Sequence, residues 1–231
     1  FDESTMTTIT KEPILENTEK WGRLEKLNKE KNVLGIYISG HPLDDYYLEV
    51  KHFCSHQLKD IDLFHSPVNS FSFSSYVQSH VEKIGKNDKP YGILFLEDYS
   101  GAKEIRLFGE NYIKFRNYFI PQSLLYFSCS MIKRKWDGSL SLKFNEVMLL
   151  SDVSKKLINE INFSIRLMDI NKDFIESITQ IIKRHPGKHN LKLSICHNDL
   201  ILNFLSKKYQ VKISSSLIRD MSILSKEYIL K

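Results

Sequence analysis

Two pairs of neighbouring carboxylates, Asp44 with Asp45 and Glu97 with Asp98, are the first residues whose types could do chemistry. Carboxylates that hold two divalent metal ions could catalyse nucleotidyl transfer. Adjacent helical residues do not share a face, however, and the first pair stands at a predicted helix start, where acids complement the helix dipole. The second pair ends a predicted strand before Ser-Gly, which favours a turn. We therefore predict that this chain has no catalytic site.

A histidine-rich segment offers a second kind of chemistry. His52, Cys54 and His56 recur at every second position, and imidazole and thiolate groups are preferred ligands of Zn²⁺. No second cluster supplies the other ligands of a tetrahedral site, so we predict that no metal is bound here. His41 lies between a glycine and a proline with no nucleophile at a recognised spacing, which favours a role in a turn.

Basic and aromatic residues gather on neighbouring predicted strands, as in proteins that bind single-stranded nucleic acid. Such proteins combine a positive groove with aromatic platforms on which bases stack. Tyr91, Lys103 and Phe108 have suitable side chains. Strand alternation predicts that other aromatic side chains point into the core, namely Phe71, Phe73 and Phe95. The residues that we predict to bind nucleic acid are Arg106, Lys133, Arg134, Lys135 and Trp136.

The elements that must position these side chains are five predicted strands. Alternating or short apolar runs predict strands at 71–81, 91–96, 103–108, 124–131 and 140–149. A short helix is predicted between the third and fourth strands, at 110–119. This is the element order of an OB-fold, a small Greek-key β-barrel that binds oligonucleotides. Residues 70–151 are therefore predicted to form an OB-fold nucleic-acid-binding domain.

The remaining sequence predicts an α+β chain of several parts. Residues 1–17 read as a polar linker, and residues 18–69 as a short helical connector. Residues 152–231 alternate strand and helix patterns and predict a small α+β domain. Its predicted strands are 161–167, 190–196, 200–206 and 209–214, with an amphipathic helix at 171–185 and a last helix from about Ser214.

Charge and cysteine content limit the function classes. Residues 1–69 carry 8 basic and 12 acidic side chains, residues 70–151 carry 11 and 8, and residues 152–231 carry 14 and 8. Any contact with a polyanion is therefore expected in the second and third parts. No apolar run is long enough to cross a membrane, and three scattered cysteines indicate no disulfide framework. We expect a cytoplasmic fragment of a longer protein, because the sequence begins with Phe1 and shows no export signal.

Three ordered motifs resemble one family. "VLGIYISGHPLDDY" (33–46) is similar to a segment that precedes the OB domain of the bacterial replicative DNA polymerase III alpha subunit. "KNDKPYGILFLEDYSGAKEIRLFG" and "YIKFRNYF" resemble the strands and helix of that OB domain, in the form found in Bacteroidetes. "HPGKHNLKLSI" resembles a stretch of the family's C-terminal domain. Together the matches cover residues 18 to about 220.

The resemblance implies a non-catalytic tail of the polymerase. The OB domain is expected to contact single-stranded template DNA, and the C-terminal domain to dock the tau subunit of the clamp loader. The remaining holoenzyme, including the sliding clamp, is implied as a partner. In the family, the Mg²⁺-dependent polymerase site lies upstream, so no cofactor is expected here. The clamp-binding motif also lies upstream, and Phe1 would be its last residue. Partner-binding candidates form an apolar set whose spacing also fits a core-facing helix: Leu217, Ile218, Met221, Leu224 and Tyr228, with Ile223 and Ile229 nearby.

Departures from the family pattern keep two alternatives open. Ser75 and Cys129 stand where the family usually has a strand glycine, and Asp88 replaces a turn glycine. One alternative is the anticodon-binding OB region of an aminoacyl-tRNA synthetase, which would prefer RNA. The other is a protein-interaction module that binds no nucleic acid, since a fold alone does not fix a function.

Overall fold

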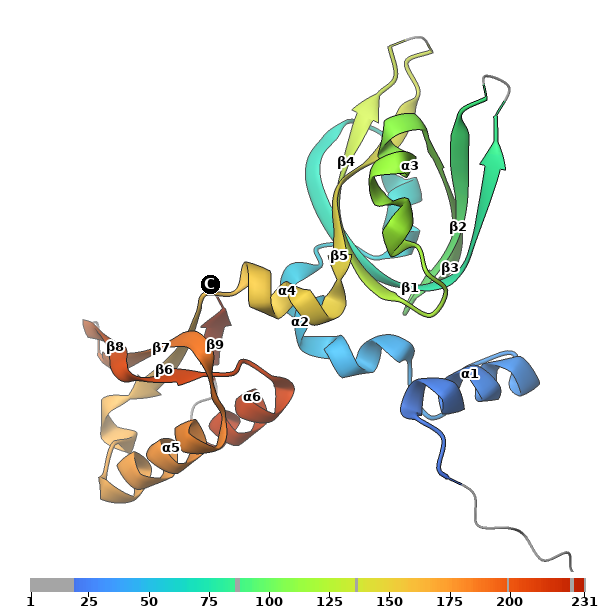
Figure 1. The fold of residues 1–231 in the computed structure, drawn as a ribbon. Coiled ribbons are helices and arrows are strands. Elements are labelled where there is room, and N and C mark those ends of the chain that lie inside the picture. Colours follow the sequence, from blue (N-terminus) through green and yellow to red (C-terminus); the bar gives the residue numbers. More distant parts are fainter. Residues whose placement is uncertain (1–18, 86–87, 136, 199, 225–226, 231) are drawn as a thin grey trace, which may run out of the picture. The chain divides into compact units, whose positions relative to one another are not determined.

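The computed structural model describes residues 19–85, 88–135, 137–198, 200–224 and 227–230. The chain divides into two compact units between His41 and Pro42. The α+β class is confirmed by helices and two separate sheets (Figure 1). In the described part of the chain no helix combines the length and the apolar character needed to cross a membrane.

Within residues 19–41, the described part of the first unit, there is one helix, α1 (Arg23–Leu34), as the connector pattern predicted. The helix ends on Gly35, whose left-handed φ of 78° lets its N–H donate to the Lys31 carbonyl at 2.8 Å. Beyond it, both Glu30 carboxylate oxygens accept hydrogen bonds from the backbone and hydroxyl of Ser39. These bonds lower the pKa of Glu30 and fix the chain that follows the helix.

Three short helices open the second unit. They are η1 (Pro42–Tyr46), α2 (Tyr47–Phe53) and η2 (Leu58–Leu63). The two acids predicted to start a helix lie in the first turn of η1, where Asp44 also accepts a hydrogen bond from the Tyr99 hydroxyl at 2.9 Å. A capping box between Gln57 and Asp60 begins η2.

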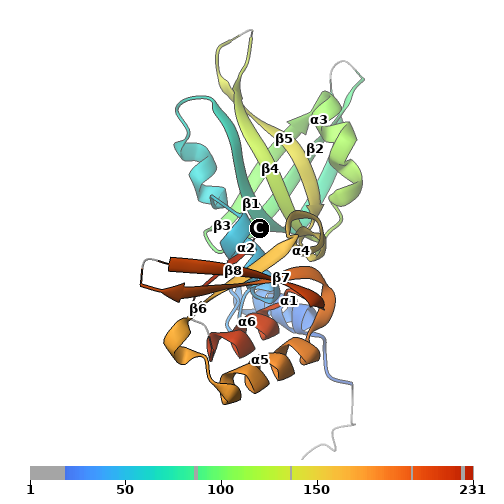
Figure 2. The same cartoon turned by 90° about the vertical axis from the view of Figure 1, so that its left-hand side faces the viewer.

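The first sheet has the five predicted strands in antiparallel order β3-β2-β1-β4-β5. Their bounds are β1 (Val68–Ile84), β2 (Pro90–Asp98), β3 (Gly101–Phe108), β4 (Leu124–Lys133) and β5 (Leu140–Leu149). The central strand β1 pairs with β4 over its first half and with β2 over its second half, and its pairing with β2 shifts register between Val77 and Ser79, close to where the two halves meet at Tyr76. This irregularity bends β1, so that both of its ends rise toward the same end of the sheet (Figures 1 and 2).

The sheet is open, which is consistent with the predicted OB-fold, a barrel that is only partly closed. Among the described residues, β3 and β5 are the two edges and are not paired with each other. Helix α3 (Gly109–Phe115), followed by η3 (Arg116–Tyr118), contacts β2, β3 and β5. Its buried Tyr112 and Phe115 join the aromatic core beneath the sheet, in which Phe73 stacks on Phe127 at 4.8 Å. The helix therefore completes the core that strand pairing alone leaves open.

The second sheet is mixed, in the order β8-β7-β6-β9. After α4 (Leu150–Leu157), strand β6 (Glu160–Arg166) and strand β7 (Pro186–His197) run parallel and are joined through η4 (Leu167–Asp169) and α5 (Lys172–Arg184). Strand β8 (Leu200–Val211) pairs with β7, and β9 (Glu227–Leu230) pairs with β6 after α6 (Ser215–Ser222). Helices α5 and α6 pack on one face of this sheet (Figures 1 and 2).

The structure differs from the sequence-based elements at three places. The predicted strand 200–206 continues without a break to Val211 as β8, which includes only the first three residues of the predicted strand 209–214, and neither α4 nor β9 was predicted. Helix α2 also contributes to two cores, because Leu48 is buried in the cluster of the second sheet while Phe53 packs against both that cluster and the one around Met148. Its His52 imidazole is 2.9 Å from the hydroxyl of Tyr228 on β9.

Candidate functional site

An aromatic pair lies on the outer face of β2 and β3. Tyr91 and Phe108 are directly opposite in the register, and their rings stack with centroids 5.2 Å apart and an interplanar angle of 22°. Alternation along β3 buries Ile105 and Leu107 and turns Phe108, which is 56% exposed, to the outside. The pair thus forms an accessible platform of the kind on which a nucleobase can stack.

Two basic side chains complete this site. A cavity of about 620 Å³ next to the platform is lined by Ile84, Gly85, Lys89, Pro90, Tyr91, Arg106, Phe108 and Gly109. Arg106, predicted from the sequence, lies here, and its Nε donates to Glu104 at 2.7 Å, which leaves its guanidinium 62% exposed. Lys89 was not predicted, although its place between a polar turn and Pro90 is a signal that it borders the strand. Two basic side chains and an aromatic pair therefore line the same cavity.

The other predicted basic residues lie at the end of β4. Lys133 ends that strand, and Arg134 forms the turn that follows, where its N–H donates to the Ser139 carbonyl and its carbonyl accepts from Gly138. Lys135 is exposed in the same turn, and Trp136 lies outside the described residues. Because β1 is bent, the far ends of β1 and β4 reach the same end of the sheet (Figure 2). The basic residues Lys133, Arg134 and Lys135 and the Tyr91–Phe108 platform therefore border the same end of the domain.

The remaining predicted strand residues have structural partners. Lys103 forms an ion pair with Asp62, and only 20% of its side chain is exposed, so it is less accessible to a ligand than Arg106. Phe71 and Phe73 are buried as predicted. Phe95 is only partly buried and lies on the outer face of β2 opposite Glu104, which corrects its assignment to the core. The reason is the register of β2, which points Leu94 and Leu96 inward.

The acidic and cysteine residues considered for catalysis or metal binding have structural roles. Asp98 is buried and accepts hydrogen bonds from the Leu58 and Ser100 N–H groups, both at 2.7 Å, and Glu97 accepts from Gln78 at 2.6 Å, which confirms the turn role of the second acidic pair. Burial raises the pKa of the Cys54 thiol to about 11. Among the described residues, no three His, Cys, Asp or Glu side chains are grouped to hold a metal ion.

The three residues that stand where the family usually has glycine lie at different structural positions. Ser75 is fully buried opposite Leu125, and its Oγ has no hydrogen-bond partner among the described residues. Cys129 is also fully buried and follows the β4–β5 register shift, where burial raises the pKa of its thiol. Asp88 has a left-handed φ of 54°, the conformation for which glycine is favoured. The backbone accommodates all three side chains without losing the sheet.

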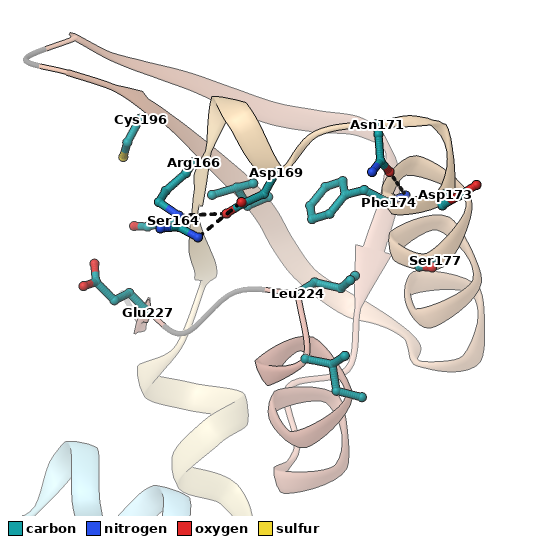
Figure 3. A pocket seen from close by; sticks show the side chains of 12 residues that line it. Ser164, Arg166, Asp169, Asn171, Asp173, Phe174, Ser177, Cys196, Leu224 and Glu227 are labelled. Atoms are coloured by element: carbon teal, nitrogen blue, oxygen red, sulfur yellow. Dashed lines mark hydrogen bonds and ion pairs between the residues drawn. The ribbon is translucent and has the colours of Figure 1, made fainter.

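A second cavity, of about 720 Å³, lies at the carboxyl ends of parallel strands β6 and β7 (Figure 3). The Arg166 guanidinium binds both carboxylate oxygens of Asp169 on one side, and Asn171 caps α5 by accepting from the Phe174 N–H at 2.8 Å. Phe174 and Leu224 supply apolar walls. None of these residues except Leu224 was predicted, although a strand end followed by a helix start in a parallel crossover is a recognised place for a binding site.

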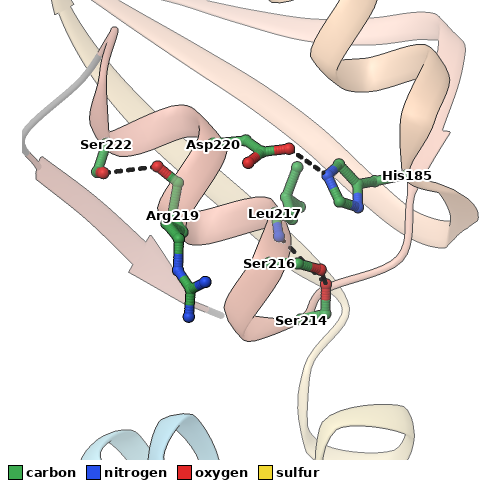
Figure 4. A network of polar contacts seen from close by, with 7 residues as sticks. All are labelled: His185, Ser214, Ser216, Leu217, Arg219, Asp220 and Ser222. Carbon is green, nitrogen blue, oxygen red and sulfur yellow. Dashed lines mark hydrogen bonds and ion pairs between the residues drawn. The ribbon is translucent and has the colours of Figure 1, made fainter.

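The predicted partner-binding residues are mostly in the core. Leu217 and Met221 are fully buried, which corrects the expectation that they form an exposed patch, while Ile218, Leu224 and Tyr228 pack partly against the same core. Helix α6 carries the first three of these residues and is fixed at its start by Ser214, whose Oγ accepts a hydrogen bond from the Leu217 N–H, whereas Leu224 follows the helix and Tyr228 lies on β9. Polar contacts, including His185 with Asp220 at 2.8 Å, hold α6 to the end of α5 (Figure 4). The apolar face of this helix thus points into the core.

Comparisons with known proteins agree with the motifs. Residues 161–224 match the family model described as the DNA polymerase III alpha subunit, C-terminal domain. The DNA polymerase III subunit alpha of Pseudomonas fluorescens is 26% identical over 163 residues, which are 71% of this chain and 14% of that protein. Those of Buchnera aphidicola subsp. Schizaphis graminum and Mycobacterium leprae are 26% and 23% identical over 88% and 89% of this chain, which covers 18% of each. The predicted resemblance to the DNA polymerase III alpha subunit is confirmed, and its Bacteroidetes form stays a prediction.

Proposed function

We propose that this chain is the C-terminal region of a bacterial DNA polymerase III alpha subunit and that it acts in chromosomal replication by binding rather than by catalysis. The observation that carries this proposal is the match to polymerase III alpha subunits along most of the chain, with the family's C-terminal domain at residues 161–224. These relatives favour a replication protein over a tRNA synthetase. The proposed setting is the cytoplasm, within the polymerase III holoenzyme and its sliding clamp.

The five-stranded sheet is proposed to contact single-stranded template DNA. In support, the Tyr91–Phe108 platform offers a base an exposed aromatic face, and Lys89 and Arg106 border it with positive charge. A stacked base contributes about 1 to 3 kcal/mol. Lys133 and Lys135, at the end of β4, would contact neighbouring phosphates as the strand leaves the platform. The fit is to a flexible single strand, whose bases can turn outward to reach the rings.

The C-terminal α+β domain is proposed to dock the clamp loader's tau subunit. Support comes from its match to the family's C-terminal domain and from apolar surface that the domain leaves exposed. Nucleotidyl transfer, with its Mg²⁺ ions, is assigned to the part of the polymerase that this chain does not span. The acidic pair Glu97 and Asp98 has a structural role here, since both carboxylates accept hydrogen bonds that stabilise the strand and the turn.

Fluorescence anisotropy of labelled single-stranded DNA, RNA and duplex DNA tests the proposed DNA contact. Single-stranded DNA should bind best, and its affinity should fall as salt rises, because bound lysines and arginines release counterions from the phosphates. Replacing Tyr91 and Phe108 together with alanine should weaken binding about 10-fold or more. The control is Tyr118→Ala, which removes a 37% exposed tyrosine away from the cavity.

Each other outcome would redirect the proposal. A preference for RNA would favour the synthetase alternative. Equal binding by the platform variant and by Tyr118→Ala would remove β2 and β3 from the site. Failure of all three nucleic acids to bind at low salt would leave a protein-interaction module.

A further inference from the structure

Strand β8 exposes an unusual amount of apolar surface for the edge of a sheet. Its side chains with more than half of their surface exposed are Leu200, Ile201, Leu202, Phe204 and Leu205. We call these five residues the β8 apolar stretch. It lies at the free edge of the second sheet, because β8 is the first strand in the order β8-β7-β6-β9. Long apolar edge strands are rare in isolated domains, since their unpaired backbone invites another strand.

The two faces of β8 are both apolar. The register places Phe204 opposite Leu193 and Leu202 opposite Ile195, so these side chains share one face, while Ile201 and Leu205 alternate to the other. A surface strand that faced water on one side would be polar there. A covering layer on one face alone would leave the other exposed, whereas an added strand contacts both faces and also pairs the free backbone.

The charges next to the stretch indicate the composition of that strand. Lys207 and Lys208 follow the stretch after one serine, and neither forms an ion pair with a described residue. Strand β8 contains no acidic residue, so a second copy pairing through β8 would bring further lysines without a counter-charge. Residues 152–231 carry 14 basic and 8 acidic side chains, which also favours an acidic partner. Opposite charges across paired strands are stabilising.

We propose that β8 is the docking edge for an extended segment of a partner protein, which adds a strand beside β8 and carries apolar side chains on both faces with acidic residues next to Lys207 and Lys208. This proposal rests on the proposed docking of the tau subunit and specifies its surface. Main-chain hydrogen bonds along the edge supply affinity, and the two lysines set the alignment of the segment.

Binding of purified tau subunit to this chain tests the docking edge, measured by biolayer interferometry. The first variant, Leu202→Thr with Leu205→Thr, removes apolar surface from both faces and introduces threonine, a β-branched residue suited to a strand. Its matched control is Val81→Thr with Ile132→Thr, at positions 42% and 44% exposed on the other sheet. The second variant, Lys207→Glu with Lys208→Glu, is matched by Lys172→Glu with Lys188→Glu. Circular dichroism verifies that each variant is folded.

The inference is supported if both β8 variants bind tau at least 10-fold more weakly while both controls bind as the unaltered chain does. Equal binding by the β8 variants and the controls would overturn the docking edge and leave tau docking intact. Failure of the unaltered chain to bind tau would overturn the proposed docking itself, and this inference with it. A dimer in sedimentation that disappears in the Leu202 and Leu205 variant would assign the edge to a second copy and so reject an acidic partner.

Discussion

Replacing Gly92 with alanine should destabilise the five-stranded sheet by about 2 to 5 kcal/mol. A Cβ atom built on Gly92 lies 2.3 Å from Cε2 and 2.6 Å from Cδ2 of Tyr112, whereas ordinary van der Waals contact begins near 3.4 Å. The Tyr112 ring would have to move by about 1 Å. It has little room, because it is fully buried and its centroid is 6.5 Å from that of Phe119.

The magnitude follows from what holds Tyr112 in place. Its hydroxyl donates to the Glu82 carboxylate and is 2.9 Å from Nε2 of His80. Overpacking costs about 1 to 3 kcal/mol. Weakening a hydrogen bond to a charged group costs about 1.5 to 3 kcal/mol. Alanine restricts the unfolded chain, which offsets about 0.4 to 1 kcal/mol.

Urea denaturation followed by circular dichroism measures this cost, and a second background identifies its cause. In Tyr112→Ala the obstructing ring is absent, so adding Gly92→Ala should cost less than about 0.5 kcal/mol more. Gly22→Ala is the control for the exchange itself, because no atom lies within 4 Å of its added Cβ. The reasoning would be refuted by an unchanged free energy of unfolding for Gly92→Ala, or by an equal cost with and without the tyrosine ring.

Three further predictions concern backbone strain, acid sensitivity and salt dependence. Asp88→Gly should raise the free energy of unfolding by up to about 1 kcal/mol, measured in urea, because glycine adopts the φ of 54° without the strain of a Cβ. Burial lowers the pKa of His80, so the unfolded chain binds more protons and stability should fall as the pH drops below about 6.5. His80→Gln should reduce this fall in a melting series, and the exposed His197→Gln should not. Lys135→Ala should lower the slope of log affinity against log salt for single-stranded DNA by about 1, with little dependence on DNA sequence; an unchanged slope would exclude a phosphate contact.

The elements predicted best from the sequence are those with an unambiguous period. Strand β5 has the predicted bounds, Leu140–Leu149, and α5 differs from its prediction by one residue at each end. The missed elements depend on distant partners. Strand β9 has only four residues and exists because it pairs with β6, a contact that no local pattern encodes. The predicted strand 200–206 was too short, because β8 continues through Lys207 and Lys208, whose side chains are exposed.

The candidate site was predictable by residue type and not by arrangement. Alternation identified Arg106 as outward, but the stacking of Tyr91 on Phe108 requires the β2–β3 register. In α6 the helical period of Leu217 and Met221 was read correctly, yet a period cannot tell whether an apolar stripe faces the core or a partner. The β8 apolar stretch was missed for the converse reason, because a continuous apolar run is as typical of a buried strand as of an exposed one.

The bent central strand also has a consequence for synthesis of the protein. The second half of β1 can pair with β2 almost at once, but its first half must wait for β4, which begins at Leu124, about 50 residues after Tyr76. At about 5 to 20 residues per second, the ribosome needs roughly 2 to 10 s to make that segment. During this interval Phe71 and Phe73 have no Phe127 to pack against, so the nascent chain carries half a sheet with an open apolar edge. While the residues between β2 and β4 are being made, the nascent chain thus exposes apolar side chains that are later buried in the core.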